Sequence, residues 1–184
     1  MRRAVFLDRD GTLIEEMGYL DRLDRLQFFP YSIDAVRLLN RAGFAVVVTT
    51  NQAGIARGLV EESFVAAAHR AIAERLAAGG ASIDGFYYCP HHPDGIVPAL
   101  RQACECRKPR PGMLVRAASE LQLDLSRSFA VGDRLHDVEA AETVGGRGIL
   151  VRTGHGARDA ARASSGTVVA DNLIAAVSWI LHAS

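Results

Sequence analysis

Short apolar segments rich in β-branched residues alternate along this chain with longer segments of helical periodicity. Apolar runs of this length are typical of strands buried on both faces of a parallel sheet. The predicted strands are Ala4–Leu7, Phe44–Thr50, Ile83–Tyr88, Ser128–Val131 and Gly148–Val151. The predicted helices are Ile33–Arg41, Glu61–Ala78, Met113–Leu121, Asp137–Val144 and Leu173–His182. This alternation predicts an α/β fold with a doubly wound, mostly parallel, Rossmann-like sheet, in a single domain spanning residues 1–184.

Two connections are longer than the few residues that usually link the elements of an α/β domain. The first insertion, residues 14–30, separates the first strand from the first helix, and the second insertion, residues 89–111, follows the third strand. Long connections in compact domains usually carry function or are disordered. Because both insertions follow strand ends, we expect them to border the functional site. A third segment, Gly154–Gly166, is small and polar, and it is expected to be a mobile surface segment.

The composition excludes several classes of partner. The chain has 21 basic and 21 acidic residues, whereas nucleic-acid and membrane-surface binders show a basic excess. No apolar run approaches the ~20 residues that cross a bilayer, and Ala4–Leu7 is too short for a signal-peptide core. The three cysteines are an odd number, which does not suit an extracellular disulfide framework. We therefore expect a cytoplasmic, monomeric protein whose partner is a small molecule, with no binding to nucleic acid or membrane.

Asp8 and Asp10 follow directly after the first predicted strand. The carboxyl ends of strands are where open α/β sheets bind ligands. Two carboxylates one residue apart repel each other unless a cation lies between them, and Mg²⁺ favours such hard oxygen ligands while it retains waters and substrate phosphate. The alternative is a polar loop that only caps the next element. The pair predicts a Mg²⁺ site formed by Asp8 and Asp10.

The segment Phe6–Leu13, which reads FLDRDGTL, resembles the Asp-x-Asp-Gly-Thr motif of the haloacid dehalogenase (HAD) superfamily of phosphotransferases. The resemblance implies that Asp8 is the nucleophile that attacks phosphorus and forms an aspartyl-phosphate. It also implies that Asp10 protonates the leaving oxygen and then helps to activate the hydrolytic water. A carboxylate nucleophile splits one difficult displacement into two easier steps.

Two later strand ends match the remaining motifs of the superfamily. Thr50 ends the second strand, so that its hydroxyl and the following backbone amides can hold phosphoryl oxygens, although a threonine there is commonly just a β-former. The segment Gly132–Asp137 is similar to the family's Gly-Asp-x-x-x-Asp. This similarity implies that Asp133 is a further Mg²⁺ ligand and that Asp137, one helical turn later, supports the ligands from outside. Alone, the segment would also fit an ordinary helix N-cap.

Lys108 is the single lysine among the 21 basic residues of the chain. A phosphoryl group and the Asp8 carboxylate repel each other unless a cation screens them, and a compact ammonium can approach both, unlike the wider planar guanidinium. The superfamily places a lysine at this step, which implies a catalytic role for Lys108. A lone surface lysine usually has no role, so the argument depends on its position beside the other motifs.

Cys89-Pro90-His91 and Cys104-Glu105-Cys106 form two close pairs of metal ligands separated by 12 residues. Three thiolates and one imidazole suit a closed, tetrahedral structural zinc site, whereas catalytic zinc keeps an open position. The gaps of one residue are tighter than usual, and His92 competes with His91 as the fourth ligand. The alternative is a set of reduced, buried cysteines with unrelated histidines.

From Ala4 to about Thr153 the chain resembles one narrow group within the superfamily, the bacterial D-glycero-D-manno-heptose-1,7-bisphosphate 7-phosphatases. The segments that carry the resemblance are Phe6–Thr12, Gly18–Tyr19, Thr50–Gly58, Tyr87–Pro93 and Cys104–Met113. It implies a small, capless, Mg²⁺-dependent phosphatase of heptose biosynthesis, either for the lipopolysaccharide core or for nucleotide-activated heptose. The residues leave that choice and the preferred anomer at C1 open, and the last 30 residues carry no motif.

The same resemblance implies which residues bind metal and substrate. It selects Cys89, His91, Cys104 and Cys106 as the zinc ligands, and the zinc-bound loop would direct Arg107, Lys108 and Arg110 into the site. Arg107 can hold the second, non-reacting phosphate bidentately. The implied substrate contacts are Glu16, Met17, Gly18, Tyr19, Thr50, Asn51, Gln52, Ala53, Arg107 and Lys108. Ala53 and Arg134 are mild departures at positions that vary among related chains.

Three alternative functions remain to be weighed. Histidinol-phosphate phosphatase, whose catalytic domain shares the core and the zinc loop, is the nearest. A polynucleotide 3′-phosphatase is disfavoured because the chain has no basic stripe for a phosphate backbone. A zinc-stabilised interaction module with an inactive core would be expected to have lost Asp8, Asp10, Lys108 or Asp133, and all four are present.

Overall fold

Six parallel strands form one sheet in the computed structural model, which describes residues 1–183. The order across the sheet is β3-β2-β1-β4-β5-β6. The strands are β1 (Ala4–Leu7), β2 (Ala45–Asn51), β3 (Gly85–Cys89), β4 (Phe129–Gly132), β5 (Arg147–Val151) and β6 (Val168–Ala170). β1 pairs with β2 on one side and with β4 on the other. The prediction of a doubly wound parallel sheet is confirmed.

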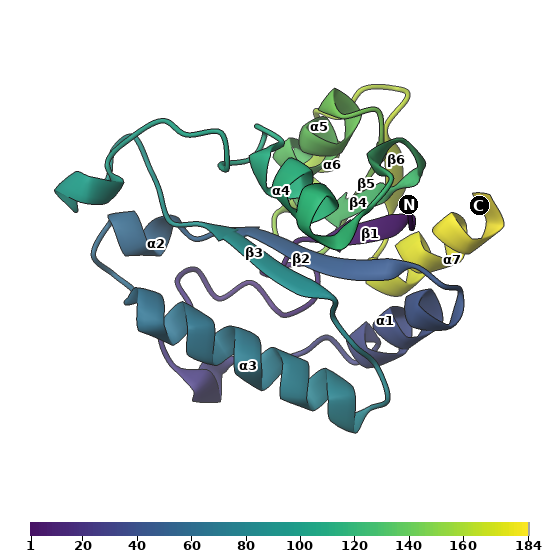
Figure 1. Cartoon of the computed structure of the whole chain (residues 1–184), viewed down its shortest axis with the longest axis horizontal. Coiled ribbons are helices and arrows are strands. Elements are labelled where there is room, and N and C mark those ends of the chain that lie inside the picture. Colours follow the sequence, from purple (N-terminus) through teal and green to yellow (C-terminus); the bar gives the residue numbers. More distant parts are fainter. Residues whose placement is uncertain (184) are drawn as a thin grey trace.

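Helices cover both faces of this sheet (Figure 1). α1 (Ser32–Arg41), α3 (Glu62–Ala78) and α7 (Leu173–Ala183) pack on one face, and α4 (Gly112–Leu121) and α5 (Leu135–Thr143) pack on the other. After β3 the chain returns to the far side of β1, so the direction of winding reverses. Right-handed crossovers then require the next helices to lie on the opposite face.

The central strand β1 determines where the functional residues emerge. Val5 and Leu7 contribute to the core beneath α1, α3 and α7, whereas Ala4 and Phe6 contribute to the core beneath α4 and α5. All four side chains are at most 1% exposed, which explains why the strand is apolar throughout instead of alternating. The first carboxylate after it, Asp8, therefore leaves the sheet at its carboxyl edge.

The predicted elements are present with shifted ends, and three short elements lacked a recognisable pattern: β6, α2 (Ala53–Ala56) and α6 (Gly156–Ala160). The segment Gly154–Gly166, expected to be a mobile surface segment, contains α6, in which Gly156 and Asp159 are buried. The Asp159 carboxylate accepts the backbone N–H of Leu135 at 3.0 Å and thereby caps the start of α5. A five-residue helix of small and charged residues shows no apolar periodicity from which it could be predicted.

Neither insertion builds a separate domain in the described residues. The first contains one 3-10 helix, Leu23–Arg25, and the second contains one 3-10 helix, Pro98–Leu100. The first insertion closes on itself through the backbone bond from Glu15 N–H to the Gln27 carbonyl, 2.8 Å. This agrees with the expectation of a capless fold. Within residues 1–183, every helix is too short or too polar to span a bilayer.

Candidate active site

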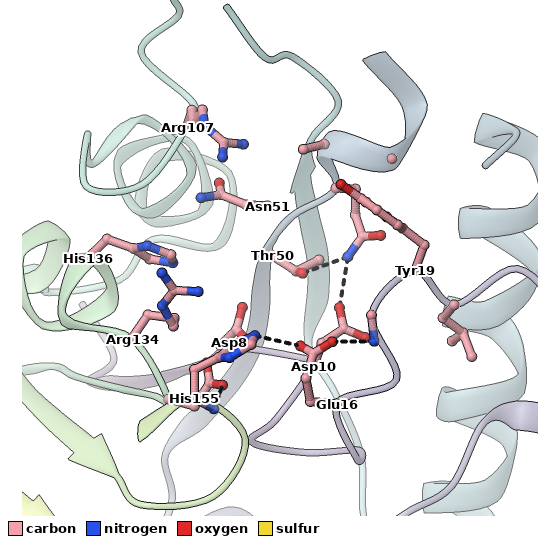
Figure 2. Close-up of a pocket in the computed structure, with 16 residues that line it drawn as sticks. Asp8, Asp10, Glu16, Tyr19, Thr50, Asn51, Arg107, Arg134, His136 and His155 are labelled. Atoms are coloured by element: carbon pink, nitrogen blue, oxygen red, sulfur yellow. Dashed lines mark hydrogen bonds and ion pairs between the residues drawn. The ribbon is translucent and has the colours of Figure 1, made fainter. Parts of the chain in front are cut away.

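The predicted site residues meet at the carboxyl edge of three neighbouring strands. Asp8 follows β1, Thr50 lies near the end of β2, and Asp133 follows β4. Because β1 lies between β2 and β4, the reversal of winding opens a crevice at this point, which is where open α/β sheets bind ligands. Figure 2 shows Asp8, Asp10 and Thr50 facing the same pocket, whose wall also includes Asp133.

Most of the predicted site residues line this pocket. They are Asp8, Asp10, Glu16, Gly18, Tyr19, Thr50, Asn51, Gln52, Ala53, Arg107 and Asp133. The predicted substrate contact Met17 does not line it, and its carbonyl accepts a hydrogen bond from Arg25 at 3.1 Å. Arg110 was expected to point into the site, but it pairs with Glu105 at 2.8 Å on the surface.

Lys108 lies beneath the pocket with its ammonium fully engaged. The Nζ atom donates to Asp8 Oδ1 at 2.7 Å and to the Thr49 carbonyl at 2.7 Å, and it lies 2.5 Å from Asp137 Oδ1. Its side chain is 2% exposed. Burial alone would lower the pKa of Lys108, but the carboxylates of Asp137 and Asp8 outweigh burial and raise it. The ammonium therefore stays charged beside Asp8.

Asp137 makes a contact in addition to the supporting role that its motif suggested. Its Oδ2 accepts the backbone N–H of Arg134 at 3.1 Å at the start of α5, while its Oδ1 faces Lys108. The carboxylate is therefore fixed by a helix terminus and in turn holds the lysine, in addition to lying near Asp8 and Asp133. Sequence spacing could place Asp137 near the metal ligands but could not reveal this contact with Lys108.

Asp8 and Asp133 form a buried carboxylate pair suited to a hard cation. Their ligand atoms, together with that of Asp137, lie within 4.8 Å of one another. Burial first, and then the charge of Asp8, raises the pKa of Asp133 to about 8. Burial and the neighbouring acids, partly offset by Lys108, raise the pKa of Asp8 to about 6. Repulsion of this kind is relieved by Mg²⁺ with carboxylate ligands, so these residues fit the predicted ion.

Two glycines make room for the Asp133 carboxylate. A Cβ atom at Gly11 would lie 2.3 Å from Asp133 Oδ2, and one at Gly154 would lie 2.2 Å from the same oxygen. Both glycines also have positive φ angles, 80° and 54°, which L side chains rarely adopt. The loops after β1 and β5 can therefore close around Asp133, whose Oδ2 accepts the His155 backbone N–H at 2.7 Å.

Asp10 is held by a hydrogen-bonded chain that also includes Thr50. Gln52 Nε2 donates to Asp10 Oδ2 at 3.0 Å and to Thr50 Oγ1 at 2.9 Å. Since the Thr50 oxygen accepts this bond, its own O–H is left to donate to a phosphoryl oxygen. The backbone N–H of Gln52 is not available for that purpose, because it donates to the Cys89 carbonyl at 2.8 Å. On the other side, the buried Arg9 guanidinium pairs with Asp10 at 2.8 Å.

Five pocket residues were not predicted as site residues: Leu20, Gly54, Arg134, His136 and His155. In Figure 2, Arg107, His136 and Arg134 lie on one side of the pocket, and Tyr19 and Glu16 lie on the other. Burial and the charge of Lys108 lower the pKa of His136 to about 3, so its imidazole is neutral. His136 and Arg134 fall inside the Gly132–Asp137 motif, which could have indicated them, whereas no sequence signal marks His155.

The three cysteines and His91 form the predicted metal cluster. Cys104 Sγ lies 3.4 Å from Cys89 Sγ and 3.3 Å from Cys106 Sγ, and His91 Nδ1 lies 3.4 Å from Cys106 Sγ. Tetrahedral bonds to zinc would separate such ligands by roughly 3.5–3.8 Å. Burial raises the pKa of the Cys89 thiol, so a thiolate there requires a cation. The donor set and its spacing fit a closed zinc site, and His92 lies outside it.

The metal cluster is tied to the pocket through Asn51. Lys108 lies two residues after Cys106, and the Asn51 side chain clamps its backbone: Oδ1 accepts the Lys108 N–H at 3.1 Å, and Nδ2 donates to the Lys108 carbonyl at 3.2 Å. The loop that carries the thiolates is thereby fixed to the end of β2. A metal ion bound to Cys106 would fix the chain two residues before Lys108.

Comparisons with known proteins agree with this geometry. A family model described as HAD-hydrolase-like matches residues 105–176. The D-glycero-beta-D-manno-heptose-1,7-bisphosphate 7-phosphatase of Yersinia pestis is 47% identical over 152 residues, covering 82% of this chain and 81% of that protein. The protein of the same name from Escherichia coli K12 is also 47% identical, with 82% and 80% covered.

Solved structures show the same similarity. The D,D-heptose 1,7-bisphosphate phosphatase of B. bronchiseptica, complexed with magnesium and phosphate, has a TM-score of 0.88 and 34% identity, covering 99% of both chains. The corresponding enzyme of Burkholderia thailandensis has a TM-score of 0.73 and 31% identity, covering 98% of this chain and 99% of that one. The fold and the site are those of a HAD-type phosphatase. Within that class, the chain belongs to the heptose-bisphosphate phosphatase family.

We predict that the purified protein contains one zinc ion per chain and that Cys104→Ser lowers the zinc content. Because the ligands cross-link a loop with little regular structure, chelation should increase tryptic cleavage after the exposed Arg101 before the helical content falls. Metal analysis, timed proteolysis and circular dichroism check this, with zinc added back as the control. Unchanged cleavage after zinc removal would contradict a structural role.

We also predict that stabilisation by Mg²⁺ grows with pH. The raised pKa values of Asp133 and Asp8 mean that, between about pH 4 and about pH 8, the metal-free folded state binds more protons than the unfolded state. These carboxyls therefore lower folding stability as pH rises through that range. Mg²⁺ binds their ionised forms, so fewer protons have to be displaced at higher pH.

Thermal unfolding of metal-free protein with and without excess Mg²⁺ measures this effect. The increase in Tm on adding Mg²⁺ should be larger near pH 8 than near pH 5, and Asp133→Asn should abolish most of that pH dependence. An increase in Tm that is the same at both pH values would contradict the prediction.

Proposed function

We propose that this protein removes the C7 phosphate of D-glycero-D-manno-heptose 1,7-bisphosphate and leaves the 1-phosphate, in a Mg²⁺-dependent reaction through an aspartyl-phosphate on Asp8. The observation that carries the proposal is the buried contact of 2.7 Å between the Lys108 ammonium and the Asp8 carboxylate beneath the pocket. Relatives that are 47% identical are named for this activity, and a similar structure from B. bronchiseptica holds magnesium and phosphate.

The first step transfers the phosphoryl group to the enzyme. An Asp8 carboxylate oxygen forms a bond to phosphorus while the bond from phosphorus to the C7 oxygen breaks. Asp10 gives a proton to that leaving oxygen, so the sugar departs as an alcohol. Lys108 and the free O–H of Thr50 would stabilise the charge on the phosphoryl oxygens during transfer.

The second step regenerates the enzyme. Water attacks the phosphorus of the aspartyl-phosphate, Asp10 accepts the proton, and the bond from phosphorus to the Asp8 oxygen breaks to release inorganic phosphate. Arg9 and Gln52 keep the Asp10 side chain in place for both proton transfers. Mg²⁺ held by Asp8, Asp10 and Asp133 would neutralise charge on the phosphoryl group.

The second phosphate of the substrate has two guanidinium groups available. Arg107 and Arg134 both line the pocket, on the same side in Figure 2. Arg134 is anchored through Nε to the buried Asp159 carboxylate at 3.3 Å, which orients its Nη atoms. Because planar guanidinium groups bind phosphate bidentately, we infer that both arginines hold the non-reacting phosphate.

These arginines favour a bisphosphate over histidinol phosphate. Histidinol phosphate has a single phosphate and a cationic amine, so two guanidinium groups beside the reaction centre would repel its remaining part. A heptose bisphosphate instead provides a second anion for them. The substrate loop, residues 14–30, forms the opposite wall through Glu16, Gly18 and Tyr19, where sugar hydroxyls would lie.

We further propose that the enzyme works in the cytoplasm as a monomer. The three cysteines are unpaired, and their sulfurs lie 3.3–3.4 Å apart where neighbours are closest. An odd set of cysteines that serves as metal ligands suits a reducing compartment, where thiols are not oxidised to disulfides. The steps proposed above use residues of one chain and call for no second copy.

Steady-state kinetics tests the proposed function. The protein should hydrolyse heptose 1,7-bisphosphate at C7 with a kcat/KM at least about tenfold above that for histidinol phosphate, a difference of about 1.4 kcal/mol in transition-state binding. Both anomers at C1 are assayed, and Asp8→Asn should abolish phosphate release with Mg²⁺ present. A clear preference for histidinol phosphate would reject the proposal, and activity retained in Asp8→Asn would reject the mechanism.

We predict that Lys108→Ala lowers kcat more than Lys108→Arg, and that both lower it by roughly 10²-fold or more, the usual cost of removing one charge-stabilising group. An arginine keeps the charge but not the compact geometry that contacts Asp8, Asp137 and the Thr49 carbonyl together. Circular dichroism establishes that each variant is folded. Full activity in either folded variant would contradict the role assigned to Lys108.

A further inference from the structure

The sequence motif Thr50–Gly58 extends beyond the residues that the proposed mechanism uses. Its last part begins with α2 and continues to Arg57, which is exposed and does not line the pocket. This part lies between the two insertions of the fold. Val97 of the second insertion donates its backbone N–H to the Ala56 carbonyl at 2.9 Å. The segment is therefore attached to the second insertion by a main-chain hydrogen bond that does not involve the Arg57 side chain.

The Arg57 guanidinium contacts one residue from each insertion. Nη1 donates to the Tyr19 hydroxyl at 2.8 Å, and Nη2 lies 3.3 Å from His92 Nε2. Tyr19 belongs to the first insertion and His92 to the second. Arg57 thus connects two segments that are far apart in sequence.

The Tyr19 ring packs directly on the backbone of α2. A Cβ atom at Gly54 would lie 2.8 Å from Tyr19 Cδ1, closer than a real contact allows. Tyr19 and Gly54 both line the pocket, and Tyr19 lies on the wall opposite Arg107 and Arg134 in Figure 2. The ring is thus fixed at two points, with its edge on Gly54 and its hydroxyl on Arg57.

The rest of the first insertion has its own anchors. Arg25 donates to the carbonyls of Met17 and Tyr19 at 3.1 and 3.3 Å. Glu16 accepts the Gly18 N–H at 2.6 Å and lies 3.8 Å from His155 on the other side of the pocket. Removal of the Arg57 side chain would therefore release the Tyr19 ring and loosen the insertion locally, while its other anchors keep it folded.

We propose that Arg57 is a positioning residue: through Tyr19 it joins the two insertions into one wall, and this wall orients the sugar of the substrate. The inference rests on the proposed function. A tyrosine offers an apolar ring face for the C–H groups of a sugar and a polar hydroxyl that needs a partner. Arg57 supplies that partner from outside the pocket, so its effect should reach the sugar and not the phosphoryl group.

The test compares two substrates. Heptose 1,7-bisphosphate contacts the wall, whereas acetyl phosphate has only a small acyl group beyond the reacting phosphate. In Arg57→Ala, KM for the bisphosphate should rise about three- to tenfold, as expected for the loss of one hydrogen bond, with kcat within about twofold. kcat/KM for acetyl phosphate should stay within about twofold. Arg70→Ala, at an exposed arginine of α3, is the matched control and should change neither.

Variants of the neighbouring residues act on the same ring by other routes. Tyr19→Phe removes the hydroxyl, and Gly54→Ala pushes the ring away, so both should raise KM for the bisphosphate in the same way. In the double variant Arg57→Ala with Tyr19→Phe, KM for the bisphosphate should be no higher than in the single variant with the higher KM, because both substitutions remove the same hydrogen bond. Trypsin should cleave faster after the exposed Arg22 in Arg57→Ala, a measurement that needs no substrate.

Three results would overturn the inference. The first is a loss of kcat/KM for acetyl phosphate in Arg57→Ala that equals the loss for the bisphosphate. The second is an unchanged KM for the bisphosphate in Gly54→Ala, and the third is additive effects on KM in the double variant. The first would place Arg57 at the reaction centre or in the fold, and the others would separate it from Tyr19. A wild-type enzyme that does not prefer the bisphosphate would reject the proposed function instead, while the proteolysis would still report on the link between Arg57 and Tyr19.

Discussion

One buried ammonium connects the segments that form the active site. Lys108 binds the carboxylate after β1, a carbonyl of β2 and the carboxylate in the first turn of α5. A buried charge is costly unless it is paired and hydrogen-bonded. Each of these segments therefore contributes to the compensation of the buried ammonium, and removing any one of them would leave Lys108 with fewer partners in the interior. The strand order brings these segments close together, and their contacts with the Lys108 ammonium fix their relative positions.

The two insertions perform different tasks around this charge cluster. The second insertion carries the metal-binding cysteines and delivers Lys108, whose backbone is clamped by Asn51 at the end of β2. The first insertion provides a wall of the pocket with Glu16 and Tyr19. The lysine beside Asp8 and the wall opposite Arg107 thus lie on separate loops attached to one rigid sheet, an arrangement that places functional residues on loops held by a scaffold.

The sequence was informative where one local pattern determines one local structure. The buried strand before Asp8, the order of the motifs and the cysteine spacing predicted the sheet, the pocket and the metal cluster. It was uninformative where contacts join distant segments. α6 has no periodicity of its own, and its Asp159 side chain caps α5. His155, which lines the pocket, directly precedes α6 in the chain. Propensity and spacing do not encode such pairings, because these form only after the chain has folded.

The two glycines that surround the Asp133 carboxylate have a consequence for how this enzyme tolerates sequence change. Gly11 and Gly154 perform no chemistry, yet a Cβ atom at either position would overlap with Asp133 Oδ2. A screen of random substitutions would therefore rank both positions with the reactive aspartates. Positions that tolerate no substitution in such a screen would therefore include residues beside which there is no space for a side chain, as well as residues that react.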